Sequence, residues 1–221
     1  MHDFYSDTKT KPTRGMLESV LAAEFGDEQK NEDPTTIELC RQVANFLGKE
    51  AAVFLPSGTI CIEIAIQVHT KPGDEVICER SCHLINFETS GPAAISGVMS
   101  IPIDGAFGIY EPDQLREAIR PPSRHAAKSR LVAVQKTANM GGGTVWPLEK
   151  LSAMAEVAKE AGLATHMDGA RLLNAAVNSA STRSRLPRDI IRSGSTSQRV
   201  SVRRWAPCSP ARKDLSNRLG A

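Results

Sequence analysis

Asp168 and Arg171 are the two side chains of this 221-residue sequence whose types and spacing point most directly to chemistry. The apolar periodicity over 148–161 predicts a helix that ends at Gly162, and a short strand is expected from Leu163. Asp168 then falls at the carboxyl end of that strand, the edge at which open α/β sheets bind ligands. A carboxylate there can hold a protonated ring nitrogen, and an arginine can hold a carboxylate or a phosphate. The other interpretation is an aspartate that caps the next helix.

A turn of small residues, Ser57-Gly58-Thr59, follows an apolar strand expected at 51–55 and precedes an apolar helix expected at 60–68. This order places backbone N–H groups and hydroxyls at a helix N-terminus, where a phosphate can bind. Many strand–helix turns contain glycine for turn geometry alone. From the residues themselves, both interpretations remain open.

His83 follows another short strand, expected at 75–78, and so falls at the same edge of the sheet. An imidazole there can be a flat plate for an aromatic cofactor or an ordinary surface histidine. The apolar run 131–134 is typical of a strand buried on both faces, and Thr137 and Asn139 lie just beyond it. We expect these loops to share one pocket, because the carboxyl ends of parallel strands lie at one edge.

Strands, turns and helices alternate along most of the sequence, which predicts an α/β fold with a parallel-rich sheet flanked by helices. Apolar residues make up 41% of the sequence, enough for a sizeable core. No apolar run is long enough to span a membrane, and residues 1–5 show no export signal. The five cysteines lack zinc spacing, and we expect no metal at Cys78, Cys82 and His83. A reduced, cytoplasmic protein is therefore expected.

Taken in order, these stretches resemble the threonine aldolases, which are pyridoxal-phosphate (PLP) enzymes of the aspartate-aminotransferase-like fold and are often classed as β-eliminating lyases. The resemblance covers residues 4–179. The motifs that carry it are Ser6-Asp7-Thr8, Glu32-Asp33-Pro34-Thr35, Pro56-Ser57-Gly58-Thr59, the stretch from His83 to Glu88, and Met167-Asp168-Gly169-Ala170-Arg171. Each motif is weak alone, and the ordered set is specific. The resemblance implies the large domain of PLP fold type I.

The resemblance also implies a role for each matching residue. Gly58 and Thr59 would bind the cofactor phosphate, and His83 would stack on the pyridine ring. Asp168 would keep the ring nitrogen protonated, so that the ring can accept electrons from the substrate Cα. Arg171 would complete the cofactor site. His83 and Asp168 are then the candidate catalytic residues.

The implied reaction is retro-aldol cleavage of a β-hydroxy-α-amino acid, such as threonine or allo-threonine, to glycine and an aldehyde. Ser6 and Arg171 would hold the carboxylate of this small-molecule substrate. Other PLP chemistry, β-elimination or serine hydroxymethyl transfer, remains an alternative. The family often has Glu-Asn-Thr-His-Asn where this sequence has Gln-Lys-Thr-Ala-Asn at 135–139, and a tyrosine where it has Lys30, which leaves the stereochemical preference open. Family members are usually homotetramers, and the assembly of this chain is left open.

The lysine that forms a Schiff base with PLP in this family is missing from its expected place after Asp168. After Ser179 the sequence becomes rich in Ser, Arg and Pro without periodicity, which argues against a packed element. We therefore assign residues 1–179 to a partial PLP-binding large domain and residues 180–221 to a basic tail, with the family's small C-terminal domain missing. Lys136, just past a strand end, is a poor substitute for the missing lysine. We expect little aldolase activity from the chain as written.

A shift of reading frame explains the tail. When the last base of each codon is read with the first two bases of the next, residues 197–211 permit Ser-Lys-Gly-Leu-Gly-Ala-Pro-Val-Gly-Ala-Val-Leu-Ala-Gly, the family's lysine stretch. The pair Trp205-Ala206 forces a glycine where that stretch has one. The sequence therefore predicts that a single-base deletion near the Ala180 codon shifted the frame.

The tail also concentrates positive charge, with ten of the 27 basic residues and two of the 25 acidic ones. A basic arm on an acidic body is a common feature of nucleic-acid-binding and membrane-surface proteins. Shifted reading of GC-rich codons produces the same charge without any binding role. A non-catalytic protein with a nucleic-acid-binding tail is therefore the less favoured alternative, and we expect no nucleic-acid partner.

Overall fold

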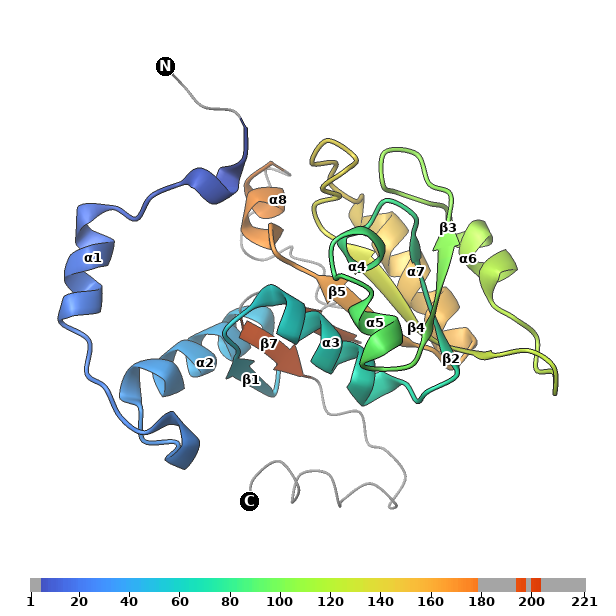
Figure 1. Ribbon diagram of the computed structural model, residues 1–221. Coiled ribbons are helices and arrows are strands. Elements are labelled where there is room, and N and C mark those ends of the chain that lie inside the picture. Colours follow the sequence, from blue (N-terminus) through green and yellow to red (C-terminus); the bar gives the residue numbers. More distant parts are fainter. Residues whose placement is uncertain (1–4, 179–193, 198–199, 204–221) are drawn as a thin grey trace. The chain divides into compact units, whose positions relative to one another are not determined.

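The computed structural model describes residues 5–178, 194–197 and 200–203 (Figure 1). Contacts within the chain divide it into two compact units, Met1–Leu39 and Cys40–Ala221. The first unit holds the short 3-10 helices η1 (Asp7–Lys9) and η2 (Glu28–Lys30), the helix α1 (Arg14–Leu21) and the start of α2 (Pro34–Leu47).

Capping side chains explain where two elements of the first unit begin. The Ser6 hydroxyl accepts a hydrogen bond from the Thr8 N–H at 3.2 Å, at the start of η1. The Thr13 hydroxyl accepts from the Met16 N–H at 3.3 Å, at the start of α1. Such oxygens satisfy backbone N–H groups that have no partner inside the helix.

Strands and helices alternate in the second unit, as the sequence predicts. The strands are β1 (Ala51–Phe54), β2 (Asp74–Glu79), β3 (Met99–Ile103), β4 (Lys128–Gln135), β5 (Ala164–Asp168), β6 (Gly194–Ser197) and β7 (Val200–Arg203). The helices are α3 (Gly58–His69), α4 (His83–Asn86), α5 (Gly91–Ala94), α6 (Pro112–Ala118), α7 (Leu148–Glu160) and α8 (Leu172–Asn178), together with the remainder of α2.

The described strands form one sheet in the order β1-β7-β6-β5-β4-β2-β3. Neighbours from β6 to β3 are parallel, whereas β7 is antiparallel to both β6 and β1. The sheet is parallel-rich and flanked by helices, which confirms the predicted α/β fold class.

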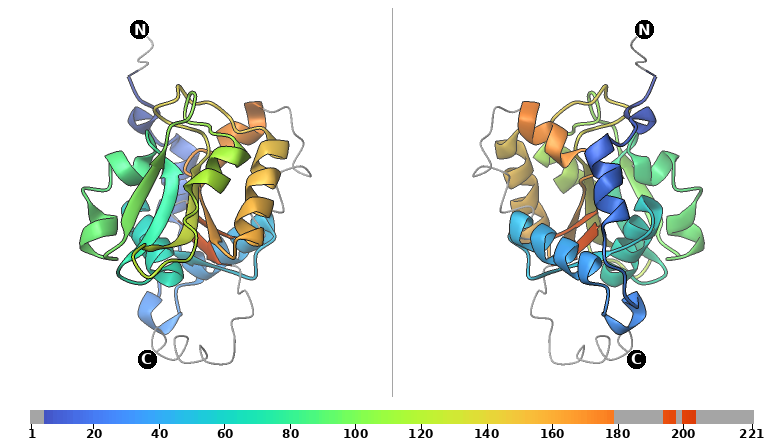
Figure 2. Two further views of the ribbon diagram at one scale, coloured as in Figure 1. Left: turned by 90° about the vertical axis from the view of Figure 1, so that its right-hand side faces the viewer. Right: turned by 90° about the vertical axis from the view of Figure 1, so that its left-hand side faces the viewer.

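Two hydrophobic cores lie on opposite faces of the sheet, because successive side chains of a strand point to opposite sides. Val132 of β4 belongs to the same core as Leu151 of α7. Its neighbour Leu131 belongs to the other core, with Ile66 of α3. Figure 2 shows α6 and α7 on one side of the sheet and α3 and α5 on the other. A strand buried on both faces has the uninterrupted apolar run found at 131–134.

The topology brings several strand ends to one edge. β2 ends at Glu79, and α4 begins at His83 a few residues later. β4 ends at Gln135, which is paired in register with Asp168, the last residue of β5. The carboxyl edge of the sheet therefore gathers polar side chains from three neighbouring strands.

Two short strands of the predicted tail, β6 and β7, pair within the sheet. The other residues from 180 onward lie outside the described residues, so the assignment of a separate tail stays a prediction. Within the described ranges, every helix is too short or too polar to cross a lipid bilayer.

Candidate cofactor site

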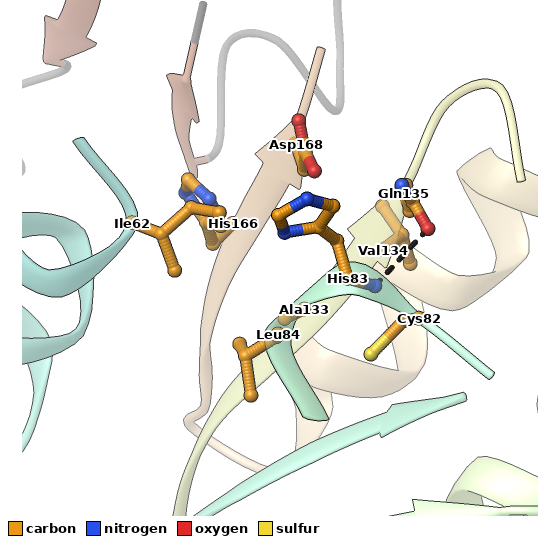
Figure 3. A pocket seen from close by; sticks show the side chains of 9 residues that line it. All are labelled: Ile62, Cys82, His83, Leu84, Ala133, Val134, Gln135, His166 and Asp168. Atoms are coloured by element: carbon orange, nitrogen blue, oxygen red, sulfur yellow. Dashed lines mark hydrogen bonds between the residues drawn. The ribbon is translucent and has the colours of Figure 1, made fainter. Parts of the chain in front are cut away.

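A pocket lies at the carboxyl edge of the sheet, on the face covered by α3 (Figure 3). It is lined by Ile62, Cys82, His83, Leu84, Ala133, Val134, Gln135, His166 and Asp168. The His83 ring and the Asp168 carboxylate both face this pocket in Figure 3. The structure thus brings together the two candidate catalytic residues, although 84 positions separate them in the sequence.

Three contacts fix His83, two through its ring and one through its backbone. Its Nδ1 lies 2.6 Å from Oε1 of Glu88, whose side chain is fully buried. Its backbone N–H donates to Oε1 of Gln135 at 3.3 Å, which ties α4 to the end of β4. Its ring centroid lies 5.0 Å from that of Phe87. The imidazole side chain keeps 37% exposure, so one edge remains available to a ligand.

Asp168 is a largely buried carboxylate at the end of β5. Burial raises the pKa of Asp168, whereas the Ala170 N–H and the nearby charges of His83 and Arg171 lower it. The Ala170 N–H donates to Oδ1 at 3.1 Å, the local bond expected of an aspartate in a turn before a helix. This bond leaves the other carboxylate oxygen for a partner in the pocket.

Gly58 and Thr59 form the first turn of α3, a 12-residue helix. Ser57 caps this helix, with its hydroxyl accepting from the Ile60 N–H at 3.2 Å. Gly58 and Thr59 are exposed, and no atom lies within 4 Å of the Cβ position of Gly58. An accessible helix N-terminus of this kind suits a phosphate group.

The remaining predicted site residues have different positions. Arg171 follows the Asp168 turn, is half-buried, and acts electrostatically on Asp168. Ser6 belongs to the first compact unit, so its role stays a prediction. Thr137 and Asn139, which we expected to contribute, do not line the described pocket.

Lys136 is a buried amine that does not line this pocket. Its Nζ donates to the backbone oxygen of Trp146 at 3.3 Å. Burial lowers the pKa of Lys136 to about 8. The bond to Trp146 does not aim the amine at His83 and Asp168, and the expectation that Lys136 is a poor substitute for the missing lysine stays a prediction.

Two functional candidates were missed by sequence reasoning. Glu88 ends one of the sequence motifs, which gives it no role, and in the structure it is the hydrogen-bond partner of His83. Glu63 belongs to no motif, and it is buried in α3 near Glu88. The sequence position of Glu63 could have indicated this burial, because Glu63 is a charged residue inside the apolar run 60–68. Such a residue is either buried with the run or interrupts its apolar face.

No group of three His, Cys, Asp or Glu side chains among the described residues could hold a metal ion. Cys78 and Cys82 are buried free thiols.

The residues present fit a phosphorylated aromatic cofactor. A flat ring between the His83 imidazole and the sheet would place a ring nitrogen toward Asp168, whose carboxylate faces the pocket and favours a cationic partner. The open first turn of α3 can accept an anion. PLP combines these three features: a ring, a protonated nitrogen and a phosphate.

Comparisons with known proteins agree with this geometry. The model of the family described as "Beta-eliminating lyase" matches residues 3–204. A low specificity L-threonine aldolase of Escherichia coli is 39% identical over 178 residues, which cover 80% of this chain and 53% of that protein. One from Saccharomyces cerevisiae is 36% identical over 182 residues, covering 80% and 46%. The chain thus spans about half the length of these curated relatives.

A solved structure, a threonine aldolase of Leishmania major, shares the fold. Its TM-score is 0.73 at 20% sequence identity, and the match covers 93% of this chain and 62% of that one. The family model matches well over half of the sequence, and the matched range contains every candidate site residue. The chain therefore belongs to the β-eliminating lyase family.

Proposed function

We propose that this chain is the cofactor-binding part of a PLP-dependent aldolase. The whole enzyme would cleave β-hydroxy-α-amino acids of the threonine and allo-threonine type to glycine and an aldehyde. The relatives from Escherichia coli and Saccharomyces cerevisiae are threonine aldolases at 39% and 36% identity. They support this substrate class over the broader lyase family.

One observation carries the proposal: His83 and Asp168 line the same pocket at the carboxyl edge of a parallel-rich sheet. When bound, PLP would supply an electron-withdrawing ring that stabilises the carbanion left by Cα–Cβ cleavage. Among the chain's own residues, Gly58 and Thr59 would hold the phosphate and His83 would orient the ring. Asp168 would keep a proton on the ring nitrogen.

The substrate carboxylate would be bound by Arg171, and the part expected of Ser6, which belongs to the other compact unit, stays a prediction. A guanidinium binds a carboxylate in a bidentate manner, which fixes the orientation of the substrate Cα relative to the ring. The orientation of the substrate selects which bond of Cα is broken, because the ring weakens only the bond that is perpendicular to its plane. The apolar lining at Ile62, Leu84 and Ala133 would exclude water from the reacting face.

Other PLP chemistry could use the same pocket. β-Elimination and serine hydroxymethyl transfer need the same phosphate, ring and nitrogen contacts, and they differ in the bond that is broken. Assays with threonine, allo-threonine and serine separate them: an aldehyde plus glycine indicates aldol cleavage, whereas pyruvate from serine indicates β-elimination.

The proposal is tested by measuring the PLP affinity of the full chain and of its His83→Ala variant by fluorescence and absorbance titration. We expect saturable binding by the wild-type chain and about tenfold weaker binding by His83→Ala, since stacking on a ring face contributes roughly 1 kcal/mol or more. Equal affinity of the two proteins would refute the proposed ring position. Pyridoxine 5'-phosphate, which lacks the aldehyde, controls for nonspecific reaction with surface amines.

A further inference from the structure

Glu63 is a buried carboxyl group in the middle of α3, and the proposed function gives it no role. The residue is 5% exposed, and its neighbours Ile62 and Ile66 belong to the core. It does not line the pocket that contains His83. A buried carboxylate without a partner is strongly unfavourable, so its position calls for a physical explanation.

The Glu63 carboxyl lies against the turn that contains Glu88. A Cβ at position 91 would overlap Oε1 of Glu63, so the glycine there leaves the space that this carboxyl fills. The Gly91 N–H donates to the backbone oxygen of Glu88 at 2.7 Å, which places both residues in one turn. Burial, and then the charge of Glu88, raise the pKa of Glu63 to about 7. Two carboxyl groups therefore lie close together behind His83.

Three oxygens of these two carboxyl groups are buried without a hydrogen-bond partner among the described residues: Oε1 and Oε2 of Glu63, and Oε2 of Glu88. The fourth, Oε1 of Glu88, is the partner of His83 Nδ1 at 2.6 Å. Ionised carboxylates only accept hydrogen bonds, so two of them cannot satisfy each other. One proton on the pair turns one acceptor into a donor and removes much of the repulsion.

The location of this proton decides the state of His83. If it is on Glu88, Glu88 can donate to Nδ1 of His83, and the ring proton is then on Nε2. If it is on Glu63, Glu88 remains an acceptor on both oxygens, and His83 must carry its proton on Nδ1. In the second case every group in the row Glu63, Glu88 and His83 has a partner.

We propose that Glu63 holds a proton, donates it in a hydrogen bond to Oε2 of Glu88, and thereby acts through Glu88 as a positioning residue for the orientation and tautomer of His83. Of the three residues in this row only His83 lines the described pocket, and both carboxyls are buried. Glu63 touches neither the pocket nor its ligand.

Other titratable groups lie on α3 itself and on the elements around this row. Besides Glu88 they are His69 of α3, His83 of α4, Lys128 and Arg130 of β4, Asp168 and His166 of β5, and Arg171 after the Asp168 turn. α5, which packs on α3, contributes no charged residue. β6 and β7 also pack on α3, and their one charged residue, Arg203, is paired in register with Ala51 at the start of β1.

The consequence for a cofactor rests on the proposed function, because only a ring stacked on His83 would sense its orientation. The hydrogen-bond row itself does not depend on PLP. The test therefore uses the full chain without cofactor, and its failure is distinct from a failure to bind PLP.

The experiment is nuclear magnetic resonance of the full chain with ¹⁵N-labelled histidine and ¹³C-labelled glutamate carboxyls. We expect a protected, downfield Nδ1 proton on His83 at pH 6, and a Glu63 carboxyl signal that titrates near pH 7. The His83 ring signals should show an inflection at the same pH. Glu63→Gln keeps a donor toward Glu88 and should retain the Nδ1 proton while losing this inflection.

Glu63→Leu removes the donor at similar volume and should lose the protection of the Nδ1 proton. The matched control is Glu75→Gln, which changes another fully buried carboxyl, the partner of Arg120 at 2.9 Å at the other end of β2. It should leave the His83 signals unchanged. Retention of the Nδ1 proton in Glu63→Leu would overturn the proposal. So would a Glu63 signal that titrates near the ordinary value of 4.5 in the wild-type chain, a measurement that requires no variant.

Discussion

Asp168 is positioned by the sheet and not by its neighbours in sequence. Its register partner is Gln135 of β4, whose amide binds the backbone of His83. One strand pair therefore sets the spacing between the carboxylate and the imidazole. A change in either strand end alters both proposed contacts to a cofactor ring.

Asp168→Asn should weaken PLP binding about 10- to 100-fold. The amide keeps the shape of the side chain and loses the charge, and a hydrogen bond to a charged group contributes about 1.5–3 kcal/mol. Fluorescence titration measures the effect. Asp113→Asn, at an aspartate whose side chain is 86% exposed in α6, is the control and should bind PLP as the wild type does. Equal affinities of Asp168→Asn and wild type would exclude the ring-nitrogen role.

The raised pKa of Glu63 predicts that the unfolding free energy of the chain depends on pH. Burial raises the pKa of Glu63 from 4.5 to about 7, so the folded chain keeps a proton that the unfolded chain releases between these values. The stabilisation is fully present below pH 4.5 and is lost as the pH rises through 7, at about 1.4 kcal/mol per unit. Relative to Glu63→Gln, the wild type should lose up to about 3 kcal/mol between pH 4.5 and pH 8.

Urea denaturation at several pH values measures this difference. The comparison with Glu63→Gln cancels the other titrating groups, because both proteins share them. A difference in unfolding free energy that stays constant over this pH range would show that Glu63 titrates normally.

Residue types alone identified His83, Asp168 and the Ser57-Gly58-Thr59 turn as candidates, because each follows an expected strand. They could not identify the role of Glu88 or the burial of Glu63. Both depend on the packing of α3 against the turn at Gly91, a contact between segments about thirty positions apart that leaves no periodic trace in the sequence.

At the scale of elements, α3 contributes Ile62 to the pocket, one turn after its N-terminal residues Gly58 and Thr59, which do not line the described pocket themselves. The Thr59 hydroxyl and the first N–H groups of the helix would meet the cofactor phosphate there. Thr59→Val keeps the branched shape and removes the hydroxyl. It should lower the affinity for PLP several-fold, at roughly 1 kcal/mol for one hydrogen bond, and leave the affinity for unphosphorylated pyridoxal unchanged.

Equilibrium titration with the two ligands measures the contrast. Thr70→Val, at the other end of the same helix, is the matched control. An equal loss for both ligands would point to a disturbed fold and not to a phosphate contact.

Two glycine-containing loops pack closely beside the end of β4. A Cβ at Gly108 would lie 2.5 Å from Cβ of Ala138, and a Cβ at Gly141 would overlap the backbone oxygen of Phe107. Ala138 is 3% exposed beneath this contact. The Ala138 side chain therefore packs against Gly108 and does not line the described pocket.

Gly141→Ala should destabilise the second unit by about 1–3 kcal/mol, the usual range for an added methyl group in a closely packed site. The atom it meets is backbone, which cannot rotate away. Gly15→Ala is the control, because no atom lies within 4 Å of its Cβ position in α1. It should be neutral or slightly stabilising, since alanine favours a helix. Chemical denaturation measures both, and equal effects would contradict the steric argument.

The elements were predictable where apolar periodicity is strong. The helix expected at 148–161 is α7 (Leu148–Glu160), and the strand expected at 131–134 is the centre of β4 (Lys128–Gln135). The strand predicted from the apolar run is shorter than β4, because pairing with β2 and β5 extends β4 through polar residues at both ends. At the start of the four-residue helix α4, the His83 N–H donates to the side chain of Gln135 in β4. A hydrogen bond between segments so far apart cannot be inferred from local sequence.

At the scale of the whole molecule, the parallel strands β2 to β5 follow from the alternation of strands and helices in the sequence, whereas β6 and the antiparallel strand β7 do not. β6 and β7 come from the stretch that composition marks as an unpacked tail. They lie between β5 and β1 in the sheet and pair through backbone hydrogen bonds, which depend little on side-chain type.

The frame-shift hypothesis predicts that restoring the reading frame restores the cofactor-binding lysine. Inserting one base before the Ala180 codon should give a chain with the family's lysine in the stretch that now reads 197–211. That chain should retain PLP after borohydride reduction and cleave threonine, because an amine held in the pocket can tether the aldehyde of the cofactor. The chain as printed should form no such adduct, since Lys136 is bonded to Trp146 and does not line the described pocket.

Mass spectrometry of the reduced proteins locates the adduct, and the restored chain with its lysine changed to alanine is the control. Sequencing of the gene around the Ser179 codon tests the deletion directly. A reduced pyridoxyl group on Lys136 of the printed chain would instead show that a buried amine of lowered pKa can be reached by the cofactor.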